Sequence, residues 1–375
     1  MIRLEPAVPD GILAAIRAPF LELGAAAIDT PVLQPLSLLL DLSGEAMRPR
    51  LFVVQADGAD EACLRPDFTI GVALAHIDGA ASAGRYIYEG KAFRVTPRDS
   101  EHAEEFLQIG LEAYGEADAV KADAAIAGLA WRAAAAGGRA DLVLEMGDVA
   151  LFRVFLEALG LSEPLVTRLG RAFRRPRALR LELERAQAPA TASGGRLAAI
   201  LAELPAGEAA QALEEIWALA GVQPVGGRSP GEIAVRLAER AGAAQAPAMA
   251  AADVDSIHRF LDIDAEPGAA LAQIGRLAKG PGLDQALSGW SDRLAALAAE
   301  GVPKDRLKLS PAFGRAFGYY DGFVFEVRSA ALDADRPAAA GGRYDSLLTR
   351  LGARRHTGAV GCMVRPWRAF AGGER

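Results

Sequence analysis

Polar side chains stand in two neighbouring stretches whose other residues are typical of strands. Arg94 lies near the end of the segment 85–95, and Gln108 and Glu112 lie four apart in the segment 105–115. Side chains four apart on a strand share a face. Unpaired charges are costly to bury. Two interpretations stay open: a solvated sheet face, or the floor of a polar pocket. In a pocket, the acid would hold an ammonium, and the amide and the arginine a carboxylate or a phosphate.

Two further groups have the same polar character. Asp67 and Thr69 stand where a helix is expected to begin, so either helix capping or ligand contact explains them. Arg315 precedes the adjacent Tyr319 and Tyr320, just before the strand-like GFVFEV. Packing at a rim with a tethered hydroxyl is the simpler explanation for the tyrosines. Together, these acids, arginines, tyrosines and one amide suit a small zwitterion such as an amino acid.

The elements that must position these groups are strands and helices of a mixed domain. Apolar residues at helical spacing predict a helix within 8–27 that starts near Pro9. The segments 85–95 and 105–115, joined by the polar loop 96–104, are expected to form an antiparallel pair. Asp345 is expected to cap the helix that follows GGRYD. Further strands are predicted in LFVVQ, ACLRP, LKLSPAF, GFVFEVRSAAL and TGAVGCMVRPWR.

Composition divides the chain into three parts. Residues 121–304 are expected to be mainly helical, because alanine and leucine dominate there and strand-forming residues become rare. Residues 1–120 and 305–375 are then the two halves of one α+β sheet domain that flank a helical insertion. The basic run 168–186 is either a solvated helix face or a contact with a partner.

Charge and cysteine content narrow the class of protein. The formal net charge is −7, whereas nucleic-acid-binding domains usually carry a basic surplus. The two cysteines form no CxxC pair and the four histidines are scattered, so no metal site is predicted. We see no signal peptide and no uncharged stretch long enough to span a membrane. A cytoplasmic protein is therefore expected.

Six motifs, taken in their order along the chain, resemble the catalytic core of histidyl-tRNA synthetases, which have a class II aminoacyl-tRNA synthetase fold. The resemblance covers about 10–120 and 305–370. It implies an antiparallel six-stranded sheet flanked by helices, and a dimer formed partly through DTPVLQP. The motifs are LRPDFTIGVALAHI, YEGKAFR, EEFLQIGLEAYG, GRAFGYYDGFVFE, GGRYDSLL and GAVGCMVRPWR.

The resemblance implies a histidine-binding pocket built from the groups noted above. Asp67 and Thr69 match an acid and a threonine near the amino group of the ligand, with Asp where the family usually has Glu. Gln108 and Glu112 match the amide and the acid that clasp the amino acid. Their spacing from Arg94 is that of the family.

Three arginines and two tyrosines complete this correspondence. Arg94 matches the motif 2 arginine, which binds the α-phosphate of ATP in the synthetases. Arg315 matches the arginine that activates the carboxylate, and Tyr319 and Tyr320 match tyrosines near the imidazole. Arg368 matches the motif 3 arginine, which lies against ATP.

Departures from the synthetase pattern lie where a nucleotide would bind. The loop after motif 2 usually carries an acid, a Gly-Arg pair and another arginine. These places are held here by Thr96, Glu101, His102 and Glu104. If each lost charge-assisted hydrogen bond is worth about 1.5–3 kcal/mol, ATP binding weakens by several kcal/mol. Before Arg368, the family's Gly-Leu-Glu is replaced by Arg365-Pro366-Trp367.

Since no anticodon-binding domain is expected after motif 3, the chain resembles regulatory subunits of ATP phosphoribosyltransferase, which are synthetase paralogues. That resemblance implies no catalytic residue, no cofactor, L-histidine as ligand, and no tRNA or membrane partner. It also implies a short-form catalytic partner whose activity and feedback control, in the first step of histidine biosynthesis, depend on this chain. The alternative, which retention of Arg94 and Arg315 favours, is a free-standing class II synthetase-like enzyme that activates an amino acid.

Overall fold

The computed structural model of this chain forms two compact units. The residues that it describes are 2–55, 57–58, 60–97, 100–173, 175–187, 200, 204–220, 248–313 and 318–373. The first unit comprises Met1–Val154 and Phe260–Arg375, and the second comprises Phe155–Arg259. Helix α4 (Ala119–Ala135) and strand β7 (Val143–Asp148) belong to the first unit, although the sequence assigned nearly all of this stretch to the helical section 121–304.

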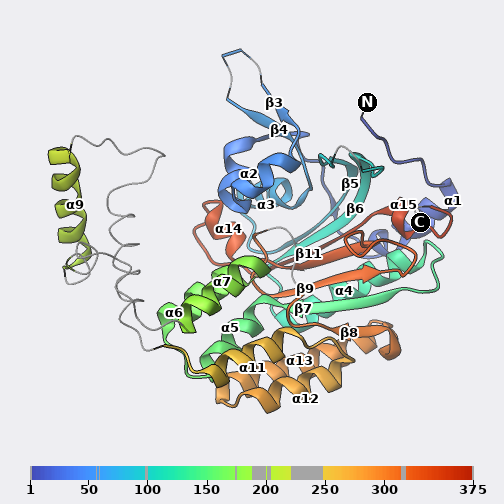
Figure 1. The fold of residues 1–375 in the computed structure, drawn as a ribbon. Coiled ribbons are helices and arrows are strands. Elements are labelled where there is room, and N and C mark those ends of the chain that lie inside the picture. The colour runs from blue at the N-terminus through green and yellow to red at the C-terminus, as the bar shows by residue number, and fades with distance from the viewer. Residues whose placement is uncertain are drawn as a thin grey trace. The chain divides into compact units, whose positions relative to one another are not determined.

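An eight-stranded sheet is the centre of the first unit (Figure 1). The strands lie in the order β1-β5-β6-β11-β10-β9-β7-β8. The six inner strands are antiparallel, and β1 and β8 pair in parallel at the two edges. The predicted six-stranded antiparallel sheet is thus confirmed, with one short strand added at each edge. The bounds are β1 Ala26–Ala27, β5 Gly84–Phe93, β6 Glu105–Tyr114, β11 Ala359–Val364, β10 Ala339–Arg343, β9 Phe323–Arg328 and β8 Leu307–Leu309.

The register of this sheet assigns each side chain to one of two faces, because directly opposed residues share a face. We name one of them the pocket face. One row of it consists of Tyr88, Gly110, Met363, Ala340 and Glu326. Gln108 and Glu112 lie on the same face, since they alternate with Gly110 at even positions of β6. Phe323 and Phe325 point to the opposite face.

A smaller sheet and several short helices belong to the same unit. The smaller sheet has the order β2-β4-β3, and its strands are Leu33–Pro35, Ala62–Leu64 and Val53–Val54. The helices are α2 (Leu36–Ser43), the 3-10 helix η1 (Glu45–Arg50), α3 (Thr69–Asp78) and α14 (Ser346–Arg350). Their apolar side chains, among them Leu39, Phe68 and Leu347, form one core with Tyr88 and Tyr344. This core fixes the start of α3 beside the pocket face.

Longer helices pack on the opposite face of the large sheet. Asp123 of α4 is fully buried and pairs with Arg293 of α13 at 2.8 Å and with Arg343 of β10 at 2.7 Å. Trp290 of α13 meets Phe323 of β9 edge to face. Besides the short helices named above, the described part of this unit has α1 (Asp10–Leu21), α4, α12 (Pro267–Leu277), α13 (Pro281–Ala299) and α15 (Pro366–Ala369), with the 3-10 helix η2 (Lys304–Arg306).

The second unit is helical where it is described. Its helices are α6 (Glu163–Ala172), α7 (Pro176–Gln187) and α9 (Ala206–Ala220), while α5 (Val149–Ala158) and α11 (Ala251–Leu261) have residues of both units. Arg168 and Arg185, in the basic run, both pair with Glu182, at 2.6 and 2.8 Å. A partner contact by this run stays a prediction. In the described part of the chain, no helix has the length and apolarity that crossing a membrane requires.

Candidate functional site

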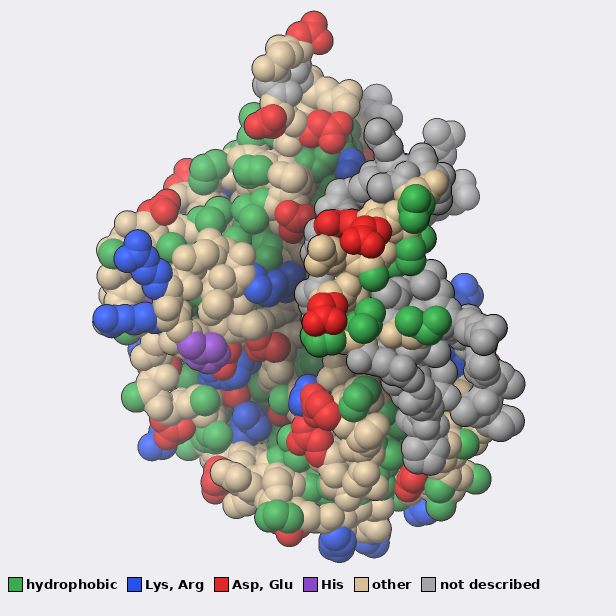
Figure 2. Space-filling view, turned by 90° about the vertical axis from the view of Figure 1, so that its left-hand side faces the viewer, with side chains coloured by type: hydrophobic (Ala, Val, Ile, Leu, Met, Phe, Trp, Pro, Cys, Tyr) green, Lys and Arg blue, Asp and Glu red, His purple; other side chains and the backbone are tan. Residues whose placement is uncertain are grey.

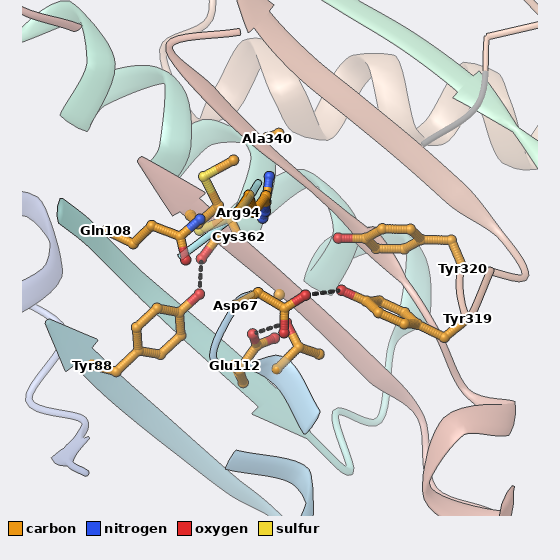
Figure 3. Close-up of a pocket in the computed structure, with 12 residues that line it drawn as sticks. Asp67, Tyr88, Arg94, Gln108, Glu112, Tyr319, Tyr320, Ala340 and Cys362 are labelled. Carbon is orange, nitrogen blue, oxygen red and sulfur yellow. Dashed lines mark hydrogen bonds between the residues drawn. The ribbon is translucent and has the colours of Figure 1, made fainter. Parts of the chain in front are cut away.

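Seven of the eight predicted ligand-binding residues line one cavity on the pocket face (Figure 3). The seven are Asp67, Thr69, Arg94, Gln108, Glu112, Tyr319 and Tyr320. The eighth, Arg315, lies outside the described residues. The cavity is completed by Tyr88, Ala340, Gly361, Cys362 and Met363, which the sequence analysis did not single out.

The polar groups are distributed around the cavity by type (Figure 3). The two tyrosines stand on one side, and Gln108 and Arg94 stand on the other. Asp67 and Glu112 lie between them. The cavity thus offers acids in the middle, aromatic hydroxyls at one end, and an amide with a guanidinium at the other.

Glu112 is the most enclosed acid of the cavity, with 1 % of its surface exposed. Its carboxylate accepts a hydrogen bond of 2.7 Å from the Thr69 hydroxyl and another from the Tyr344 hydroxyl. Burial raises the pKa of Glu112 to about 8, and the bonds from Tyr344 and Thr69 offset that rise only in part. At neutral pH the carboxyl is therefore mostly protonated until a cation binds beside it.

Asp67 and Thr69 contact cavity residues instead of capping α3. The helix starts at Thr69, and no side chain caps its N-terminus. The Thr69 hydroxyl donates to Glu112, and the Tyr319 hydroxyl donates to Asp67 Oδ2 at 3.4 Å. The capping explanation is wrong here, because tertiary partners engage these two side chains.

The cap predicted at Asp345 is wrong for the same reason. Its carboxylate makes no cap to α14. Instead, Asp345 Oδ1 accepts the backbone N–H of Ala359 at 2.7 Å and the guanidinium of Arg343 at 2.9 Å. This residue therefore ties β10 to the start of β11, close to the cavity.

Gln108 projects from the pocket face with its amide fully buried. Neither Nε2 nor Oε1 of Gln108 has a hydrogen-bond partner among the described residues. Buried polar groups are nearly always hydrogen-bonded, so an unsatisfied amide in a cavity wall is available to hydrogen-bond a ligand. The solvated-face explanation for Gln108 and Glu112 is wrong, since both side chains are buried.

Arg94 stands at the amide end of the cavity. Its Nε donates to the backbone oxygen of Pro66 at 2.9 Å, which fixes the guanidinium just before α3. The guanidinium lies 5.3 Å from the ring centre of Phe106. An arginine held in this way is suited to a carboxylate or a phosphate.

Arg368 is not brought to the cavity. It belongs to α15, and its Nη1 is 3.5 Å from the backbone oxygen of Pro337. Burial, followed by the neighbouring cations Arg365 and Arg336, lowers the pKa of Arg368 well below its usual value. In the described part of the chain, no three His, Cys, Asp or Glu side chains meet as a metal site would require.

Two tyrosines that the sequence analysis missed support the cavity. Tyr88 stacks on Phe68 with ring centres 4.4 Å apart, and its hydroxyl donates to the backbone oxygen of Cys362 at 3.4 Å. A Cβ at Gly110 would stand 2.2 Å from the Tyr88 hydroxyl, so only glycine leaves room for this ring. Tyr344 lies in the motif GGRYDSLL, and its hydroxyl donates to Glu112.

Comparisons with known proteins identify the family of the chain. The family model of histidyl-tRNA synthetase matches residues 11–226 and 233–366. Among curated relatives, the ATP phosphoribosyltransferase regulatory subunit of Brucella anthropi is 34% identical over 94% of this chain and 95% of that protein. The protein of the same name from Allorhizobium ampelinum is 37% identical with the same coverage.

Solved structures show the same fold at lower identity. An ATP phosphoribosyltransferase regulatory subunit/histidyl-tRNA synthetase from Bacillus halodurans has a TM-score of 0.64 and 19% identity, and the match covers 97% of this chain and 80% of that one. A histidine–tRNA ligase subunit from Alicyclobacillus acidocaldarius has a TM-score of 0.58, with 99% and 98% coverage and 22% identity. The chain thus has the class II synthetase fold and belongs to the family of ATP phosphoribosyltransferase regulatory subunits.

Proposed function

We propose that the cavity binds L-histidine and that this chain controls a catalytic partner without catalysing a reaction of its own. One observation carries the proposal: the amide of Gln108, fully buried and without a partner among the described residues, points into a cavity that also holds Asp67, Glu112 and Arg94. A free amino acid supplies both the donors and the acceptors that this set of groups needs.

Histidine fits the cavity group by group. Its ammonium suits Asp67 and Thr69, and its carboxylate suits Arg94 at the amide end. Its imidazole suits the tyrosine end, where Tyr320 packs beside Gly342, whose added Cβ would lie 2.9 Å from the ring. Glu112 lies between the two ends and can accept a hydrogen bond from either cationic group.

The absence of catalysis is supported by the loop that follows Arg94. The side chain of Arg3 binds two residues of this loop. It donates a hydrogen bond to Thr96 Oγ1 at 2.5 Å and forms an ion pair with Glu104 at 3.2 Å. Because Glu104 neutralises Arg3, the described residues of this loop offer no uncompensated arginine to a triphosphate. The alternative, an enzyme that activates an amino acid, keeps one supporting observation, because Arg94 still reaches the cavity.

Partners follow from the family and from the surface. The relatives are named regulatory subunits, and we infer a short-form catalytic ATP phosphoribosyltransferase chain as partner. A dimer through DTPVLQP is supported by Val32 and Leu33, which are 43% and 53% exposed. Figure 2 shows acidic and basic side chains interspersed over one face, whereas tRNA binding favours a basic field.

Co-expression with a short-form transferase chain tests this proposal. We expect co-elution on size exclusion, transferase activity that requires this chain, and an effect of histidine on that activity. Glu112→Ala should remove the histidine effect and leave the complex intact. Glu89→Ala is the matched control, because Glu89 also lies on a strand of the sheet but pairs with Arg17 at the surface. Histidine-dependent exchange between ATP and pyrophosphate by the isolated chain would contradict the proposal.

A further inference from the structure

Arg365 is a buried arginine next to the last strand of the cavity. This residue follows β11 directly, two positions after the cavity residue Met363, and its backbone N–H continues the ladder by donating to Ala338 at 2.8 Å. Because side chains alternate along a strand, the side chain of Arg365 projects from the pocket face, as does that of Met363. The Arg365 side chain is 3% exposed. It therefore fills the space next to the amide end of the cavity.

The Arg365 guanidinium lies on the ring of Phe106. Its central carbon is 3.4 Å from the ring centre, which is van der Waals contact for two flat groups. Phe106 belongs to β6, on the same face as Gln108, and also lies 5.3 Å from the guanidinium of the cavity residue Arg94. No second flat group fits on the side of the ring that Arg365 covers.

Glu5 holds Arg365 in this position. Glu5 Oε1 accepts from Arg365 Nη2 at 2.7 Å, and the two side chains are 6% and 3% exposed. The other oxygen of Glu5 accepts the backbone N–H of Leu107 at 3.3 Å. Glu5 thus neutralises the arginine that borders the cavity.

The N-terminal segment fixes Glu5 in turn. The backbone N–H of Glu5 donates to Glu105 at 3.1 Å, and the backbone oxygen of Arg3 accepts from Glu104 at 2.8 Å. The segment therefore lies along the start of β6, one strand position from the cavity residue Gln108. Arg365, Phe106 and Glu5 thus form one buried cluster, which we name the plug. Strand β6, the residue after β11 and the N-terminal segment each contribute one of its members.

We propose that Arg365 determines ligand specificity: it ends the cavity just beyond the group that Arg94 binds. A free amino acid then fits, and an amino acid extended through its carboxylate by a phosphate and an aromatic base does not. The extension would need the face of Phe106 for its base, because aromatic platforms are where proteins stack bases. It would also need a second cation beyond Arg94 for its phosphate, and Glu5 already neutralises Arg365.

This inference rests on the proposed amino-acid ligand, and a competition of two probes tests it. The probes are L-histidine and 5′-O-[N-(L-histidyl)sulfamoyl]adenosine, a stable mimic of a histidyl nucleotide, each titrated by calorimetry. We expect the wild-type protein to bind histidine at least about tenfold more tightly than the mimic. Arg365→Ala should strengthen binding of the mimic at least about tenfold, and leave the affinity for histidine within about threefold.

A variant of similar size shows whether the volume or the charge of the Arg365 side chain excludes the mimic. Arg365→Met removes the charge but keeps a long side chain on Phe106, and it should still exclude the mimic. If Arg365→Ala does not fold, as a thermal melt would show, Glu5→Ala combined with Arg365→Ala removes both members of the buried pair and leaves no stranded carboxylate.

The results distinguish a failure of the role proposed for Arg365 from a failure of the proposed histidine ligand. A wild-type protein that binds the mimic more tightly than histidine overturns the inference, as does an unchanged ratio of the two affinities in the folded alanine variant. A wild-type protein that binds neither probe contradicts the proposed ligand itself, and the inference falls with it.

Discussion

The carboxylate of Glu112 lies directly against the backbone of Gly361, its cross-strand neighbour in β11. A Cβ added at Gly361 would stand 1.6 Å from Glu112 Oε2. The same carboxylate is held by Thr69 and Tyr344, and it is fully buried, so it has no other place to go. Glycine at 361 therefore allows the acid to lie in the floor of the cavity.

Gly361→Ala is expected to lower the affinity for histidine at least tenfold. The added methyl group forces Glu112 away from Thr69 and Tyr344, and hydrogen bonds to a charged group are worth about 1.5–3 kcal/mol each. Calorimetric titration measures the loss. Gly289→Ala in α13 is the matched control, since its added Cβ meets no atom within 4 Å and should stabilise the helix by up to about 1 kcal/mol. Wild-type affinity in Gly361→Ala would refute this role.

Histidine affinity is expected to rise as the pH approaches about 8, the raised pKa of Glu112. Below that value the free carboxyl holds a proton, which a bound cation displaces, so affinity rises by at most about tenfold per pH unit. Titrations in buffers of different ionisation enthalpy count the released proton. Glu112→Gln should release one proton fewer than the wild-type protein. Equal proton release by the two proteins would show that Glu112 does not face the cation.

The stability of the ligand-free protein should depend on pH in the opposite sense. The pKa of Glu112 is raised above its ordinary value of 4.5, so its contribution to stability is complete below about pH 4.5. That contribution is lost as the pH rises through about 8. Urea unfolding at several pH values should show the decline in the wild-type protein and a flatter profile in Glu112→Gln. An equal decline in both proteins would assign the effect to other groups.

Gln108→Met is expected to stabilise the protein and to abolish the binding of histidine. An unsatisfied buried amide costs about 1–3 kcal/mol, and methionine has a similar shape without that cost. The free energy of unfolding should therefore rise by about 1 kcal/mol while histidine binding is lost. Urea denaturation and calorimetry measure the two effects. A loss of stability would mean that the amide has a structural partner in the free protein.

Asp123→Ala is expected to cost about 3–5 kcal/mol of unfolding free energy, because it leaves Arg293 and Arg343 buried without their shared carboxylate. Glu89→Ala removes an ion pair with Arg17 that is about one-third exposed, and should cost less than about 1 kcal/mol. Urea denaturation compares the two variants. Equal losses would show that the Asp123 cluster contributes no more than a surface pair.

The sequence predicted those parts of the fold that depend on local pattern. The antiparallel pair β5 and β6 follows from two strand-like segments around a polar loop, and motif order located the cavity residues on them. Strand β7 was missed, because it lies in an alanine-rich section and gains its partners from β8 and β9, far along the chain. Local reasoning also failed at Asp345, where the N–H of Ala359 and the guanidinium of Arg343 bind the carboxylate in place of a helix cap.

The supporting contacts of the site could not be predicted, because they join distant positions. Tyr344 reaches Glu112 across a separation of 232 residues, and Arg365 reaches Glu5 across 360. Each of these contacts requires the register of the sheet, which a single sequence does not specify. The role expected of Arg315 stays a prediction, since this residue lies outside the described part of the chain.

Calorimetric titration of the isolated chain with L-histidine, beside the same titration of Glu112→Ala, tests the central claim most directly. The account predicts one histidine bound per chain in the wild-type protein, and no measurable binding in a variant that remains folded by thermal melting. Wild-type affinity in Glu112→Ala, or no binding to the folded wild-type chain, would contradict it.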